Sequence, residues 1–109
     1  MDEFLADMKR IISISEVVES ARSWQGQWEL RATAEADYHE TKSELVVQLD
    51  SFVRTADVKL PSGLPQGWLP KKQTLVERMP WEDALPAAKE IFQRWVRKVR
   101  QSLPSTVNH

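Results

Sequence analysis

The sequence predicts an all-α fold, a compact bundle of four or five helices closed by a crossover rich in proline and glycine. Three observations lead to this prediction. Apolar residues recur at helical spacing near both ends, two Ser/Thr-x-x-Glu capping boxes begin helix-like segments, and turn-forming residues concentrate in 61–70. The 109 residues include 41% hydrophobic and 28% charged residues, so we expect one globular domain over 1–104 and a flexible tail over 105–109.

The first helix is expected over 2–12, with acidic residues at its start and basic residues at its end, as the helix dipole prefers. Its apolar stripe consists of Phe4, Leu5, Met8, Ile11 and Ile12. Ser13 and Glu16 then match a capping box, in which each side chain bonds the other residue's backbone amide. A second helix is expected from residue 14, with a break near Gly26, because glycine costs about 1 kcal/mol relative to alanine inside a helix.

The middle of the chain has two interpretations. Apolar and polar residues alternate strictly over 28–38, which is typical of a strand, yet the alanines and charged residues of this segment favour a helix. Thr41 and Glu44 match a second capping box, and the residues after it fit either a helical stripe or a strand. We favour helices. The alternative is an α+β fold, in which a hairpin from 28–38 and 44–53 packs on the terminal helices.

The last third begins with the crossover 61–70, which holds three of the six prolines and two of the three glycines. A short helix is expected over 71–79, before Pro80. The final helix is expected to have Asp83 as its N-cap, to tolerate Pro86 within its first turn and to end near Leu103.

The final helix carries basic residues on one side and apolar residues on the other. At about 100° per residue, Arg94, Arg97 and Lys98 lie opposite an apolar arc that includes Leu85 and Trp95. A protein that binds single-stranded nucleic acid places aromatic side chains among its cations, whereas Trp95 belongs to the buried side. The helix dipole also favours basic residues near this end, so we interpret the charges as a solvated face.

Composition narrows the function. The chain has no cysteine, which excludes disulfides and thiolate sites. We expect no signal peptide, no transmembrane helix and a cytoplasmic location, because no long apolar run occurs. His39 pairs with Glu35 alone at helical spacing, too few ligands for a metal site. We therefore expect no metal, no cofactor and no catalytic residue.

The sequence thus predicts a small non-catalytic cytoplasmic protein-interaction or adaptor domain. Its partner is expected to be a protein, which can be a second copy of the chain, and not a membrane. The candidate contact residues are Leu64 and Trp68 in the crossover, and Arg94, Arg97 and Lys98 on the final helix. Two alternatives rank lower: a nucleic-acid-associated protein that uses the basic C-terminal helix, and a small enzyme with a site near His39.

Overall fold

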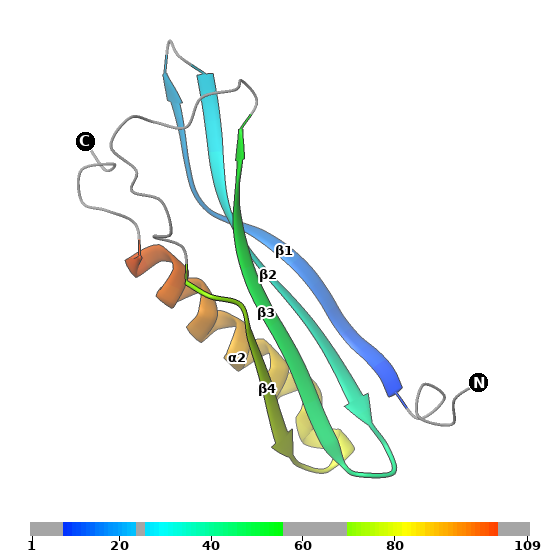
Figure 1. Cartoon of the computed structure of the whole chain (residues 1–109). Helices are drawn as coiled ribbons and strands as arrows, with labels where there is room; N and C mark the ends of the chain where they lie inside the picture. The colour runs from blue at the N-terminus through cyan, green and yellow to red at the C-terminus, as the bar shows by residue number, and fades with distance from the viewer. Residues whose placement is uncertain (1–7, 24–25, 56–69, 103–109) are drawn as a thin grey trace.

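The computed structural model describes residues 8–23, 26–55 and 70–102, which form an antiparallel sheet with a helix across one face (Figure 1). Each strand pairs with the next one along the chain: β1 Met8–Ser23, β2 Gly26–His39, β3 Glu44–Thr55 and β4 Gln73–Arg78. The helix, α2, spans Trp81–Gln101. The all-α prediction is therefore wrong. The α+β alternative is closer, because its hairpin is present as β2 and β3.

The alternation in β2 is a genuine strand pattern. Every second side chain from Trp28 to Tyr38 is buried, and Ala32, Ala34 and Ala36 are each exposed by 1% or less. Alanine is a poor strand former by itself, but strand preference depends strongly on what packs against the strand. Here the small side chains leave room for α2 to lie close against the sheet, so the alanine content reflects helix–sheet packing.

Strand β1 replaces the predicted first and second helices. Residues 8–12 belong to β1, and the rest of the predicted first helix lies outside the described residues. Register shifts between Arg10 and Ile12 and between Val17 and Glu19 mark two bulges. A bulge inserts one extra residue into a strand, which gives Met8, Ile11 and Ile12 the spacing of a helix. The first capping-box sequence lies between the two bulges, inside the strand.

The second capping-box sequence forms a turn instead of a helix start. Residues 40–43 connect β2 to β3, and the Ser43 amide donates to the Glu40 carbonyl at 3.3 Å. Ser43 adopts a left-handed conformation with φ of 52°. Short polar side chains that cap helices also stabilise turns, so the local signal was ambiguous and strand pairing decided between the two structures.

In the C-terminal region the predicted short helix is wrong, and the predicted final helix is present, although the positions predicted for Asp83 and Pro86 within it are wrong. The segment expected to be a short helix over 71–79 contains β4, which pairs with β3 at the sheet edge. Helix α2 begins at Trp81 with Pro80 in the N-cap position, so Asp83 lies in its first turn, and Pro86 lies inside the helix beyond that turn. The predicted crossover, apart from Pro70, and the predicted tail lie outside the described residues.

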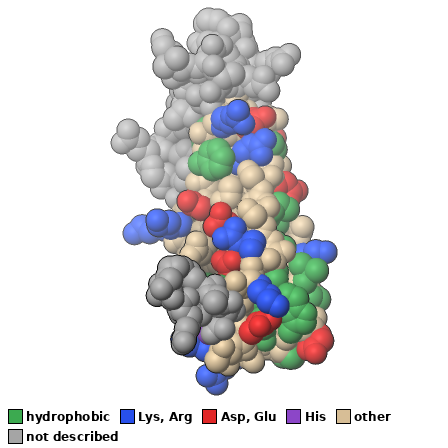
Figure 2. Space-filling view, turned by 90° about the vertical axis from the view of Figure 1, so that its right-hand side faces the viewer, with side chains coloured by type: hydrophobic (Ala, Val, Ile, Leu, Met, Phe, Trp, Pro, Cys, Tyr) green, Lys and Arg blue, Asp and Glu red, His purple; other side chains and the backbone are tan. Residues whose placement is uncertain are grey.

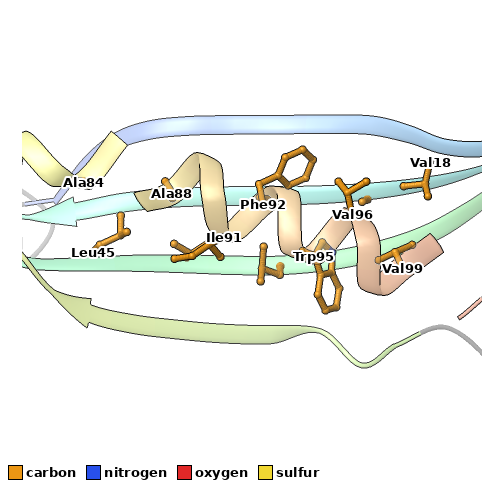
Figure 3. Close-up of a cluster of buried hydrophobic side chains, with 14 of the residues drawn as sticks. Val18, Leu45, Ala84, Ala88, Ile91, Phe92, Trp95, Val96 and Val99 are labelled. Carbon is orange, nitrogen blue, oxygen red and sulfur yellow. The ribbon is translucent and has the colours of Figure 1, made fainter. Parts of the chain in front are cut away.

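The core lies between the sheet and α2. Figure 3 shows side chains of α2 directed at β2 and β3, with Val18 of β1 near Val99 at the far end of the helix. Trp95 is 2% exposed, and its indole N–H donates to the Asp50 carbonyl on β3 at 2.7 Å. α2 does not cover the opposite face of the sheet. The candidate site lies between α2 and the edge strand β1.

Candidate functional site

The structure describes three of the five predicted contact residues. Leu64 and Trp68 lie outside the described residues, whereas Arg94, Arg97 and Lys98 are exposed on α2. Arg94 donates to Glu90, one turn earlier, at 2.5 Å, and this hydrogen bond is the main cause of the raised pKa of Arg94. The Lys98 ammonium lies 5.7 Å from the centre of the Trp95 ring. The buried position of Trp95 confirms that its indole belongs to the core.

His39 lies at the end of β2, next to the turn. It is 5% exposed, and its Nδ1 accepts a hydrogen bond from the Lys42 amide at 3.3 Å. None of the three hollows described below is lined by His39. Within the described ranges, no cluster of three or more His, Cys, Asp or Glu side chains is arranged to hold a metal ion. In the same ranges, no helix is both long and apolar enough to span a membrane.

An apolar groove runs between α2 and β1. Trp81, Leu85 and Lys89 follow one another at four-residue spacing, which places them in a row along one side of the helix. The groove has a volume of about 470 Å³ and is lined from β1 by Ile12, Ser13 and Ile14, and from α2 by Lys89, Phe92 and Gln93. This volume lies within the range of ligand pockets, about 300–1,000 Å³. We call this site the β1–α2 groove.

Large apolar side chains are exposed beside the groove. Trp81 is 51% exposed, Leu85 42% and Ile14 40%. Figure 2, which views the molecule from the side of β1 in Figure 1, shows hydrophobic side chains gathered at the lower end, where α2 begins. Exposed apolar side chains that cluster around a groove are a feature of interaction sites, whereas scattered ones need no explanation.

One wall of the groove is a strand edge. β1 is the first strand of the sheet and pairs with β2 alone in the described sheet, so its other side presents backbone amides and carbonyls. Ile12 and Ile14 pair in register with Ala36 and Ala34, whose side chains are buried beneath α2. The two isoleucines therefore project on the helix side of this edge. A chain that approaches β1 thus meets hydrogen-bonding groups and an apolar groove together.

Charged groups mark both ends of this edge. Near the start of β1, Lys9 bonds Glu40 at 2.6 Å, and its ammonium lies 5.9 Å from the centre of the Trp81 ring. Farther along β1, Glu16 pairs in register with Ala32 and therefore projects on the same side as Lys9. At the upper end, Arg100 of α2 donates to the Val18 carbonyl at 3.5 Å. The helix side of the edge is thus basic at its start, apolar in its middle and acidic after that.

The opposite face of the sheet has a wider, polar hollow of about 680 Å³. Short or uncharged polar side chains from every strand contribute to it: Ser13, Ser15, Thr33, Gln48 and Thr74. Arg10 bonds Asp37 at 2.7 Å and lies 3.6 Å from Glu35 on this face, and the bond to Asp37 raises the pKa of Arg10. Glu35, Asp50 and Lys72 also line the hollow, so charges of both signs favour no single ligand chemistry.

A third, smaller hollow of about 130 Å³ lies on the other side of α2, where Arg94 and Lys98 meet Leu75 and Glu77 of β4. Two of the predicted contact residues therefore line one depression. It is smaller than typical ligand pockets.

Comparison with known proteins assigns neither a family nor a function to this chain. The chain matches no family model, and neither the curated proteins nor the solved structures contain a match.

Sequence reasoning did not identify the β1–α2 groove. It assigned Leu85 to the buried arc of the final helix, but Leu85 is 42% exposed. It assigned Ile12 to the apolar stripe of a helix and did not single out Ile14 or Trp81. The helical pattern held no signal for this exposure, because Leu85 lies in the same arc as Phe92 and Val96, which are buried.

Proposed function

We propose that this protein is a small interaction domain that binds an extended segment of a protein along β1. The added segment would continue the sheet through backbone hydrogen bonds and place alternate apolar side chains in the β1–α2 groove. Peptide recognition of this kind takes its affinity from the strand edge and its specificity from side-chain pockets. The observation that carries the proposal is the position of the groove directly beside the edge of β1 that pairs with no strand among the described residues.

Two properties of the groove support an apolar, extended occupant. Its side-chain lining includes Ile12, Ile14 and Phe92, with Lys89 the charged residue among them. Side chains of a strand alternate between the two faces of a sheet, so every second residue of an added segment would lie over this lining. The absence of cysteine supports the cytoplasm as the setting.

The alternatives receive less support from the arrangement of side chains. A nucleic-acid interface on α2 would use Arg94, Arg97 and Lys98, but Arg94 already bonds Glu90 and the nearby indole of Trp95 is buried. A base therefore finds no exposed aromatic surface to stack on at that position. An enzyme with a site near His39 would need reactive groups around an accessible histidine, whereas His39 is 5% exposed.

The proposal is tested by selecting ten-residue peptides from a random displayed library and mapping the best binder on the isotopically labelled chain by NMR. Amide shifts should concentrate on residues 12–17 and on Lys89 and Gln93. Ile14→Glu should weaken binding at least tenfold, because it places a charge over the apolar groove. Val76→Glu is the matched control, since Val76 is 54% exposed on β4, at the other edge of the sheet, and should leave the affinity unchanged. Shifts centred on Arg94–Lys98 or on the polar face, or failure of a monomeric chain to select any binder, would refute the proposal.

A further inference from the structure

We infer that the extended segment bound along β1 is β1 of a second copy of this chain. The two strands would pair antiparallel around a two-fold axis at Ser13 and join two four-stranded sheets into one. The inference rests on the proposed function, because it uses the same edge and the same groove. The order of side chains along β1 points to a second copy. When two copies of β1 run in opposite directions, this order places apolar side chains opposite apolar ones and basic side chains opposite acidic ones.

The faces of β1 follow from its register with β2. Lys9, Ile12, Ile14 and Glu16 pair with Tyr38, Ala36, Ala34 and Ala32, which are all buried on the helix side. Between Lys9 and Ile12, the bulge at Ile11 adds one residue without changing this assignment. The helix side of the edge therefore reads, in order, basic, apolar, apolar and acidic.

Antiparallel pairing around Ser13 matches this order with its own reverse. Ile12 then lies opposite Ile14 of the second copy, and Ile14 lies opposite Ile12. With the extra residue Ile11 left unpaired in the new strand pair, as it is against β2, the next helix-side positions bring Lys9 opposite Glu16 of the second copy, and symmetry repeats the pair. Opposite charges and apolar pairs directly across two strands are both stabilising. Moving the axis by one residue, to Ile14, would instead place Ile12 opposite Glu16.

The groove completes this arrangement. In the pairing around Ser13, Ile14 of the second copy lies beside Ile12, which lines the groove together with Phe92. Ile14 is 40% exposed in the single chain, and this contact would cover it. The two-fold axis is perpendicular to the sheet, so both α2 helices lie on the same face, one on each side of the new strand pair.

The other edge of the sheet is less suited to this pairing than β1. Pairing around Ser13 keeps residues 12–14 in regular alternation, and it includes the bulge at Ile11 on the way to Lys9. At the opposite edge, β4 has six residues and ends in Glu77 and Arg78. Short and charged edges resist the addition of strands. Growth of the sheet therefore stops at two copies.

The test is sedimentation equilibrium of the full chain over a wide concentration range, at low salt. The chain should form dimers. Lys9→Glu and Glu16→Lys should each weaken the dimer about tenfold, because each change creates two like-charge contacts across the axis. The double variant should recover the original affinity. An equimolar mixture of the two single variants should form heterodimers in preference to either homodimer, since only the mixed pair restores both contacts.

Two controls separate this pairing from general effects of charge and folding. Glu19→Lys makes the same charge change on β1 beyond the second bulge and should leave the dimer intact. Circular dichroism should show that every variant is folded, because Lys9 and Glu16 are exposed. Dimers that are insensitive to Ile14→Glu and to both charge reversals would overturn the inference.

The inference and the proposed function can fail separately. A chain that stays monomeric at every concentration, but whose residues 12–17 respond to a selected peptide, binds a foreign segment, so only this inference is wrong. A monomeric chain without any peptide response refutes both. A dimer in which the charge-swapped mixture pairs selectively establishes β1 of a second copy as the occupant.

Discussion

Trp95 offers the sharpest test of how α2 is held on the sheet. Replacing it with phenylalanine keeps an aromatic ring in the core but removes the indole N–H that donates to the Asp50 carbonyl at 2.7 Å. A buried acceptor left without its donor costs about 1–3 kcal/mol. The smaller ring also buries roughly 40 Å² less surface, worth about 1 kcal/mol at 25 cal/mol per Å². We expect Trp95→Phe to lower the free energy of unfolding by about 2–4 kcal/mol.

The measurement is urea denaturation followed by circular dichroism at the helix band, which avoids the change in tryptophan fluorescence. Trp81→Phe is the matched control, since Trp81 is 51% exposed and contacts Tyr38 edge-on at 5.3 Å between ring centres. This control should change stability by less than about 1 kcal/mol, as substitutions of exposed residues usually do. A loss below about 0.5 kcal/mol for Trp95→Phe, with an unchanged denaturant slope, would refute the conclusion that the Trp95–Asp50 hydrogen bond holds α2 on the sheet.

Three further substitutions test other parts of the fold by the same assay. Ser43→Gly should raise the free energy of unfolding by about 0.5–1 kcal/mol, because glycine has no β-carbon to strain the φ of 52°, whereas Ser43→Ala should not stabilise. Ala36→Leu should cost about 1–3 kcal/mol by overpacking the fully buried space beneath α2, and retained stability would contradict the close helix–sheet packing. Tyr38→Phe should cost about 1 kcal/mol, since its hydroxyl donates to the Met79 carbonyl at 2.8 Å before α2 begins, and an unchanged midpoint would show that this bond contributes nothing.

The sequence predicted α2 well because its pattern is local. Trp95 and its apolar neighbours recur at helical spacing, and the structure buries most of them. The alternation from Trp28 to Tyr38 was equally visible, but the alanines within it had two explanations. Only the position of α2 above β2, a contact between distant segments, shows that small side chains are needed there. Local propensity could not supply that information.

Strand β1 was mispredicted for a definite physical reason. Its bulges at Ile11 and Val18 interrupt the two-residue period of a strand and produce apolar spacings of three and four. Both inserted residues contribute to the core, so the irregularity has a packing role. The groove was missed as a consequence, because it exists only where β1 and α2 meet. Among the predicted contact residues, Arg94, Arg97 and Lys98 were correctly placed on the exposed side of the helix. The sequence of the helix alone could not show that β1 lies beside it.

The order of the strands has a consequence for how the chain reaches this structure. The first three strands follow one another closely in sequence, so β1–β2 and β2–β3 can form as successive hairpins, whereas β4 begins 18 residues after the end of β3 (Thr55 to Gln73). Loops that close over short separations lose less entropy, and folding is correspondingly fast. A lone hairpin is only marginally stable in water, so we expect α2 to pack on the sheet late in folding and to stabilise it. The sheet before α2 has packed on it is then the species most exposed to aggregation.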